Sequence, residues 1–223
     1  MNPFNDRSEY NQSKYNERNE TKIIDVKVTV VGESAAGKSS LSRRIVYDDF
    51  KSDINTTIGA AYLVIKKTRG PYTFKLNFWD TAGQEKYKSL VPMYIKGATV
   101  VLLVFDITNR ESFQEIKRNW YGYAMTNAEL STKILVGTKL DLESERRVST
   151  AEVEEFAQSR NLKYIECSSK LNQNVDKILE IILSSVSPIL PPEIFLTKET
   201  VDINNNFGQR VESCMGGNRC YTY

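Results

Sequence analysis

Residues 32–39 read Gly32-Glu33-Ser34-Ala35-Ala36-Gly37-Lys38-Ser39 and fit the phosphate-binding pattern G-x-x-x-x-G-K-[ST]. They follow an apolar, β-branched run at residues 26–31 and precede a helical pattern at residues 41–46. A strand, a glycine-rich turn and a helix in this order aim backbone N–H groups and the positive end of the helix dipole at one point. A random chain of this length would show the pattern in about one case in a hundred. The stretch therefore predicts a nucleotide-binding loop, called the phosphate loop below.

The residues of the phosphate loop have distinct expected roles. Gly32 and Gly37 lack a Cβ, which permits the turn and a close approach of backbone to phosphate. Lys38 is expected to reach the β- and γ-phosphates, and the Ser39 hydroxyl is expected to ligate Mg²⁺. The other expected nucleotide contacts in this stretch are Glu33, Ser34, Ala35, Ala36 and Ser40.

Composition excludes several functional classes. The net charge of the 223 residues is +2 and no basic block occurs, which argues against nucleic acid as a partner. The chain has no histidine, so histidine catalysis and histidine metal ligands are excluded. Cys167, Cys214 and Cys220 make neither a disulfide framework nor a zinc site, and Cys167 is expected to be a small buried filler. No apolar run approaches the ~20 residues of a membrane span, and the polar N-terminus is not a signal peptide.

The chain divides into one domain and two ends. Residues 1–21 are rich in Asn, Glu and Arg without periodicity, and residues 187–223 carry prolines, an Asn run and a Gly pair. Such segments have too little apolar surface to offset the entropy of ordering, so a disordered N-terminal extension and a flexible tail are expected. Residues 22–186 are long enough for one buried core.

Hydrophobic patterning within residues 22–186 predicts strands and helices in alternation. The run at residues 98–105 is apolar throughout, as a central strand covered on both faces requires. Ser149 and Glu152 form a capping box that marks a helix start. The alternation predicts an open, mostly parallel, six-stranded α/β sheet with helices on both faces. Ligands of such sheets bind at the carboxyl ends of the strands. The expected strands are 26–31, 60–66, 73–79, 99–105, 133–137 and 163–166, and the expected helices are 37–46, 87–95, 111–125, 150–160 and 174–185.

A second loop follows the third expected strand and reads Asp80-Thr-Ala-Gly83-Gln84. An Asp at a strand end is suited to the Mg²⁺ shell, and the N–H of Gly83 is suited to sensing a γ-phosphate. Gln84 is then placed to orient an attacking water. Alone, an Asp-x-x-Gly sequence is an ordinary turn about as often as it is a phosphate site. Because this one occurs together with the phosphate loop, the combined pattern is specific.

These motifs resemble the small GTPases of the Ras superfamily, and within them the Rab branch. The resemblance covers residues 25–186 and implies the small G domain of the P-loop NTPases. The stretches at residues 57–63, 79–87 and 90–94 look like the early-endosomal Rab subgroup. By position, Thr57 matches the threonine that completes the Mg²⁺ shell and contacts the γ-phosphate only in the GTP state. Phe50 matches the aromatic residue beside the guanine ring, although a partly buried core Phe is an equally ordinary reading of it.

Two further motifs imply guanine recognition. Thr138-Lys139-Leu-Asp141 resembles the N-K-x-D motif, in which the Asp accepts two hydrogen bonds from guanine and the Lys stem packs along the base. Adenine lacks that donor pair, so a strong preference for guanine is expected. Thr138 departs from the usual Asn, a substitution common in the Rho branch. Residues 166–170, called the base loop below, resemble the E-T-S-A-K loop; in it Ser168 and the Ser169 N–H would hold the guanine O6 side and Lys170 would stabilise the loop.

The resemblance implies a GTP hydrolase that switches effector recruitment in vesicle and endosomal traffic. Lys38, Thr57 and Gln84 are its expected catalytic residues, and Ser39, Thr57 and Asp80 its metal ligands. No arginine lies where the family places one in cis, so intrinsic turnover on the order of 10⁻⁴ to 10⁻³ per second is expected, raised by a partner's arginine. The implied partners are exchange factors, GTPase-activating proteins, GDP-dissociation inhibitors or escorts, and effectors. Effectors would bind a monomer at the aromatic cluster Tyr62, Trp79 and Tyr94; plain core packing is the alternative reading of these rings.

The tail predicts reversible attachment to the cytosolic face of endosomal or vesicle membranes. Cys220, with Cys214 as an alternative, matches the position of a prenylated cysteine, but the following Tyr-Thr-Tyr fits C-a-a-X only formally. No polybasic patch supports a single lipid chain, which binds membranes weakly alone.

Two other functions remain as alternatives. A nucleotide-binding scaffold with negligible turnover is suggested by Thr138, the tail and the N-terminal extension. An ATPase or kinase is opposed by Asp141.

Overall fold

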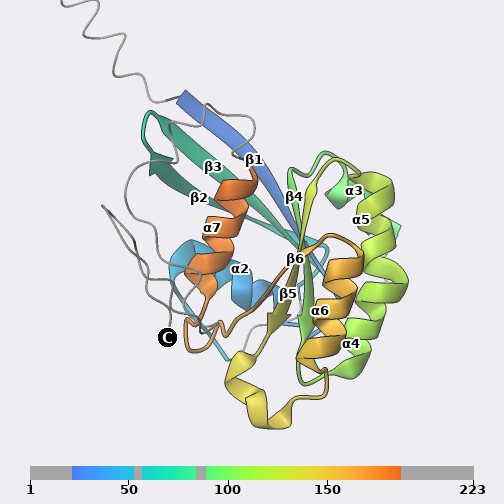
Figure 1. Cartoon of the computed structure of the whole chain (residues 1–223). Helices are drawn as coiled ribbons and strands as arrows, with labels where there is room; N and C mark the ends of the chain where they lie inside the picture. Colours follow the sequence, from blue (N-terminus) through green and yellow to red (C-terminus); the bar gives the residue numbers. More distant parts are fainter. Residues whose placement is uncertain (1–21, 53–56, 84–88, 187–223) are drawn as a thin grey trace, which may run out of the picture.

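The computed structural model describes residues 22–52, 57–83 and 89–186 (Figure 1). The expected N-terminal extension and tail lie outside these residues, and so do Gln84, Cys214 and Cys220.

The described residues form one six-stranded sheet in the order β2-β3-β1-β4-β5-β6. Strand β2 runs antiparallel to β3, and all the other neighbours are parallel, as the sequence predicts. The strands are β1 (Lys22–Val31), β2 (Ala60–Arg69), β3 (Tyr72–Thr81), β4 (Val100–Asp106), β5 (Thr132–Thr138) and β6 (Lys163–Glu166).

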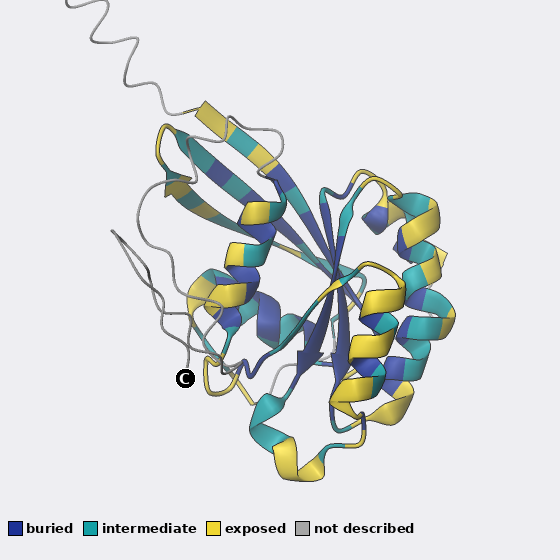
Figure 2. Ribbon diagram, viewed as in Figure 1, coloured by how far each residue is buried: buried dark blue, intermediate teal, exposed yellow. Residues whose placement is uncertain are grey.

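Helices cover both faces of the sheet (Figure 1). One apolar core lies between the sheet and helices α2 (Lys38–Tyr47) and α7 (Val175–Ser185). The second core lies beneath the remaining helices, whose inward faces are buried (Figure 2). Its members include Phe105, Phe113 and Trp120. These helices are α3 (Val91–Ile95), α4 (Arg110–Glu115), η2 (Ile116–Trp120), α5 (Tyr121–Asn127) and α6 (Thr150–Ser159). Every residue of β4 is buried, which confirms the prediction of a central strand.

The helical segments differ from prediction in three places. The single helix expected at 111–125 is continuous but widens into the π-helical turn η2, which buries Ile116 and Trp120. Of the helix expected at 87–95, residues 87 and 88 lie outside the described part, residues 89–90 form a 3₁₀ turn, and α3 occupies only Val91–Ile95. A 3₁₀ helix, η3 (Leu140–Glu145), follows β5 and was not predicted.

Half of the predicted capping box forms at the start of α6. The Glu152 N–H donates to Ser149 Oγ at 3.3 Å. The Glu152 carboxylate pairs instead with Lys117 and Arg110, so it ties α6 to the neighbouring helical segments rather than closing the box.

The carboxyl ends of the parallel strands lie along one edge of the sheet. Val30 pairs with Asp80, Asp106 with Thr138, and Gly137 with Glu166. The loops that carry the sequence motifs therefore begin side by side, although the motifs are far apart in the chain.

Candidate nucleotide-binding site

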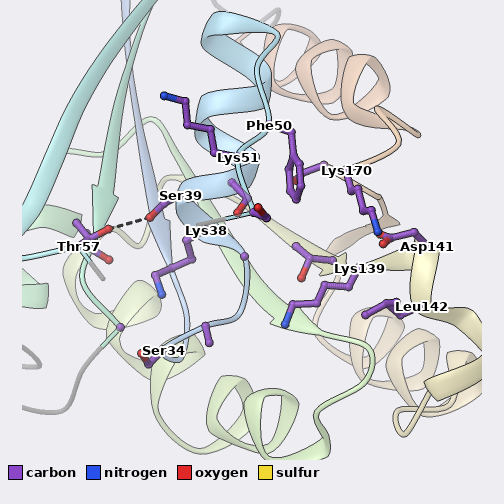
Figure 3. Close-up of a pocket in the computed structure, with 18 residues that line it drawn as sticks. Ser34, Lys38, Ser39, Phe50, Lys51, Thr57, Lys139, Asp141, Leu142 and Lys170 are labelled. Atoms are coloured by element: carbon purple, nitrogen blue, oxygen red, sulfur yellow. Dashed lines mark hydrogen bonds between the residues drawn. The ribbon is translucent and has the colours of Figure 1, made fainter. Parts of the chain in front are cut away.

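A pocket of about 470 Å³ opens at this edge of the sheet (Figure 3). The phosphate-loop side chains and Thr57 lie at one end, and Phe50, Asp141 and Lys170 lie at the other, with Lys139 between. Most of the predicted nucleotide-binding residues line it: Ser34, Ala35, Gly37, Lys38, Ser39, Ser40, Phe50, Thr57, Gly83, Thr138, Lys139, Asp141, Ser169 and Lys170. Gly32, Glu33, Ala36 and Ser168 are not among the lining residues, and Gln84 lies outside the described residues.

The two glycines of the phosphate loop serve different purposes. Gly37 has a φ of 85° at the N-cap of α2, a conformation that side chains with a Cβ rarely adopt. Gly32 has a φ of 147°, and a Cβ there would lie 2.0 Å from the carbonyl oxygen of Val104. The missing Cβ of Gly32 therefore makes room for β4 rather than for phosphate.

Lys38 is held inside the phosphate loop. Its side chain is 5% exposed, and its Nζ donates to the carbonyl oxygen of Glu33 at 2.7 Å. Burial lowers the pKa of Lys38 to about 8, against the opposing charges of Asp80 and Glu33. A phosphate placed in the loop would add negative charge beside this desolvated ammonium group and stabilise its charged form.

Oxygen ligands suited to a cation gather next to Lys38. Ser39 Oγ and Thr57 Oγ1 lie 2.8 Å apart (Figure 3). Asp80 is 2% exposed, and its Oδ1 has no hydrogen-bond partner among the described residues. Burial raises the pKa of the Asp80 carboxyl, while nearby Ser39, Lys38 and Thr57 act in the opposite direction.

This set of ligands fits Mg²⁺. A buried carboxylate oxygen without a partner is costly, and a hard divalent cation would satisfy it. The described residues contain no cluster of three or more acidic, Cys or His side chains that could hold a metal alone. One carboxylate with two hydroxyls matches the way Mg²⁺ takes its other ligands from substrate phosphates and water.

Gly83 brings the second loop against the phosphate loop. A Cβ on Gly83 would lie 2.4 Å from Lys38 Nζ and 2.5 Å from the Ser34 amide nitrogen. Only glycine fits this approach, which sets the backbone of residue 83 beside the groups expected to hold phosphate.

At the opposite end, Asp141 is oriented by the base loop. Ser168 Oγ donates to Asp141 Oδ1 at 2.5 Å, and the Leu171 N–H donates to Ser168 Oγ at 3.0 Å. Ser168 is fully buried, so it faces Asp141 rather than the pocket. Lys139 has a φ of 63°, and its Nζ lies 2.6 Å from Asp106 Oδ2.

Thr138, the departure from the family motif, joins β5 to the phosphate loop. Its hydroxyl oxygen lies 2.7 Å from the carbonyl oxygen of Ala36 and 3.0 Å from that of Phe105. The hydroxyl has one hydrogen, so the two carbonyls share a single donor. A threonine at this position therefore still anchors the phosphate loop.

Sequence reasoning missed several contributors to the site. Lys51, Ser52, Thr81 and Leu142 line the pocket, and each lies within two positions of a predicted residue. Asp106 was also missed, although an Asp directly after a fully apolar strand was a signal that it lies at the ligand edge.

The three aromatic residues expected to face effectors lie together. The ring centroids of Tyr62 and Trp79 are 5.2 Å apart, and those of Trp79 and Tyr94 are 6.1 Å apart. Tyr62 is 52% exposed, and its hydroxyl donates to Asn77 Oδ1 at 2.7 Å. Core packing alone does not account for a ring that is half in solvent.

Cys167 is fully buried, and burial raises the pKa of its thiol to about 12. The expectation of a small buried filler is thereby confirmed. Within the described residues, every helix is too short or too polar to cross a membrane.

Comparison with known proteins matches this chain to one family. The Ras family model matches residues 27–187. The chain is 35% identical over 199 residues to Ras-related protein Rab-5A of Dictyostelium discoideum, covering 88% of this chain and 98% of that protein. It is 39% identical over 173 residues to Ras-related protein RABF2a of Arabidopsis thaliana, covering 77% of this chain and 86% of that protein. The chain therefore belongs to the Rab branch of the Ras family of small GTPases, the guanine-nucleotide-binding GTP hydrolases that act as switches in vesicle and endosomal traffic.

Proposed function

We propose that this GTPase holds GTP or GDP with Mg²⁺ in the 470 Å³ pocket, with phosphates at the Lys38 end and guanine at the Asp141 end. The observation that carries the proposal is the orphaned Asp80 Oδ1 beside the paired Ser39 and Thr57 hydroxyls. The G domain would span residues 22–186, flanked by the extension 1–21 and the tail 187–223.

The chain's own groups supply positioning and charge for phosphoryl transfer. Lys38 holds the β- and γ-phosphates, and the amides of residues 34–40 surround them. Mg²⁺, when bound, neutralises charge on the phosphate oxygens. Gln84 orients the attacking water, and Thr57 and the Gly83 N–H respond to the presence of the γ-phosphate.

A direct test of turnover is single-turnover GTP hydrolysis by the full chain, compared with the Gln84→Leu variant. We expect the variant to lose most of the slow intrinsic rate while GDP affinity is unchanged. Equal rates in the two proteins would reject Gln84 as the residue that orients water.

The metal ligands are tested by binding rather than by turnover. Calorimetry of GDP binding with and without Mg²⁺ should show tighter binding with the metal in the wild-type protein. Asp80→Asn should reduce this difference, because the substitution removes the buried anionic ligand. A Mg²⁺ effect of the same size in both proteins would contradict the assignment of Asp80.

Partner binding is assigned to the aromatic cluster Tyr62, Trp79 and Tyr94 together with the two nucleotide-responsive loops. Effectors would bind there in the GTP state, while exchange factors, GTPase-activating proteins and GDP-dissociation inhibitors would act on the same loops. The exposed ring of Tyr62 supports this surface, and its internal bond to Asn77 fixes where the hydroxyl points. Tyr62→Ala should weaken effector capture from GTP-loaded protein without changing GDP release.

Membrane attachment is assigned to prenylation of Cys220, with Cys214 as the alternative, and localisation to endosomal or vesicle membranes. Intact-mass measurement of protein from cells should reveal the added lipid, and Cys220→Ser should release the protein to the cytosol. An unmodified mass with unchanged localisation in the variant would reject this assignment.

A further inference from the structure

Arg44 lies near the end of α2 and connects the segments on either side of the proposed base site. Its Nε donates to the carbonyl oxygen of Ser169 at 2.8 Å, and its Nη2 lies 3.4 Å from that of Lys170. Its Nη1 donates to the carbonyl oxygen of Asp48 at 2.8 Å. The Arg44 side chain is 13% exposed and is not among the residues that line the nucleotide pocket.

Both segments that Arg44 holds lead directly into the pocket. Ser169 and Lys170 line it from the base loop. Asp48 ends α2 in a left-handed conformation with a φ of 51°, two residues before Phe50, which also lines the pocket. A guanidinium group has several donors in one plane, so a single side chain can fix both segments at once.

A second contact closes the same connection from the other side. Asn172 Nδ2 donates to Asp48 Oδ1 at 3.2 Å, so the turn after α2 and the segment after the base loop are joined directly. The Arg44–Asp48 ion pair itself is worth little, because the Asp48 side chain is 79% exposed. The hydrogen bonds to backbone carbonyls, of which the one to Ser169 is partly buried, therefore carry the connection.

We propose that Arg44 is a positioning residue for guanine recognition, which holds the base loop and the turn before Phe50 in place and thereby slows nucleotide release. Arg44 touches no part of the nucleotide in this arrangement and acts through Ser169, Lys170 and Asp48. The inference rests on the proposed function, because it takes the base loop and Phe50 as the guanine site.

The test is the dissociation rate of fluorescently labelled GDP from the full chain carrying Arg44→Ala. We expect release about tenfold faster than from the wild-type protein, because the bonds from a charged donor to the carbonyls of Ser169 and Asp48 are lost. Arg118→Ala is the control. Arg118 lies on η2, its Nη1 pairs with Glu111 at 2.7 Å, and neither residue lines the nucleotide pocket.

A second probe separates positioning from a general loss of stability. The diphosphate of 2-aminopurine riboside lacks the 6-oxygen that the base loop is proposed to hold. Arg44→Ala should accelerate GDP release by a larger factor than release of this analogue, whereas a merely structural effect would accelerate both equally. Arg44→Lys keeps the charge but not the fork of donors, so its GDP release should be intermediate; this variant also serves if Arg44→Ala does not fold.

The outcomes are distinguishable from failure of the proposed function. If the wild-type protein binds no GDP, both the proposed function and the inference about Arg44 are rejected. If it binds GDP and both Arg44→Ala and Arg44→Lys release it as slowly as Arg118→Ala, or if GDP and the analogue are affected by equal factors, the inference about Arg44 alone is overturned.

Discussion

Replacing Thr138 with Val removes one buried hydroxyl and leaves the shape of the side chain nearly unchanged. The hydroxyl oxygen lies 2.7 Å from Ala36 O and 3.0 Å from Phe105 O, and Thr138 is 2% exposed. Loss of a buried donor that leaves acceptors unpaired costs about 1–3 kcal/mol. For a domain of this size, each kcal/mol corresponds to about 2–4 °C, so we expect the melting temperature to fall by about 2–12 °C. If all of that free energy were lost from the nucleotide-bound state, GDP release would accelerate by about 5- to 150-fold.

Two measurements show how much of the lost free energy affects folding and how much affects nucleotide binding. Urea unfolding of nucleotide-free protein gives the change in the free energy of unfolding, and release of labelled GDP gives the change in the bound state. Thr68→Val is the control, because it also removes a hydroxyl. That hydroxyl lies 3.1 Å from the hydroxyl of Thr73 at an exposed position. If Thr138→Val matched Thr68→Val in both measurements, the account of Thr138 as an anchor of the phosphate loop would be refuted.

Three further predictions follow from the same geometry. Burial lowers the pKa of Lys38 to about 8, and bound phosphates should raise it. Above pH 8, GDP binding therefore takes up a proton. The GDP affinity, measured by calorimetry, should fall about fivefold between pH 8 and 9. Stability of nucleotide-free protein should change in the opposite direction, rising above pH 8, because unfolded Lys38 holds its proton more tightly. Gly83→Ala should lower the ratio of GTP to GDP affinity by about tenfold in competition binding, since its Cβ would lie 2.5 Å from the Ser34 amide nitrogen; an unchanged ratio would contradict the expected γ-phosphate contact. At about pH 8, iodoacetamide should spare Cys167 in the native protein and modify it after denaturation, as read by peptide mapping.

The sequence predicted the sheet well because the strand signals are local. The fully apolar run ending at Phe105 and the glycine-rich turn after Val31 each fix a strand and its end without reference to the rest of the chain. The helix ends were less predictable. The π turn at Ile116–Trp120 buries Ile116 and Trp120, and no periodicity in the sequence indicates a turn of this type.

The sequence identified the site residues that belong to a motif, but it did not identify residues that act on the site through their neighbours. Lys38 and Asp141 carry their chemistry in fixed spacings, so pattern alone placed them at the pocket. The function of Gly32 was misread, because the clash it avoids is with Val104, more than seventy positions along the chain. The contacts of Arg44 were invisible for the same reason, since its carbonyl partner Ser169 lies 125 residues away.

The positions of Thr138 and Arg44 indicate that the phosphate and base ends of the pocket are not held independently. Helix α2 begins at Lys38 and contains Arg44, so one element carries the proposed phosphate-binding residue at its start and the connection to the base loop near its end. Thr138 links the same phosphate loop to the strand that leads into Asp141. A partner that shifts α2 would therefore loosen both ends together. Because the proposed nucleotide spans both ends, we expect a small displacement of this helix to accelerate its release more than separate disruption of either end.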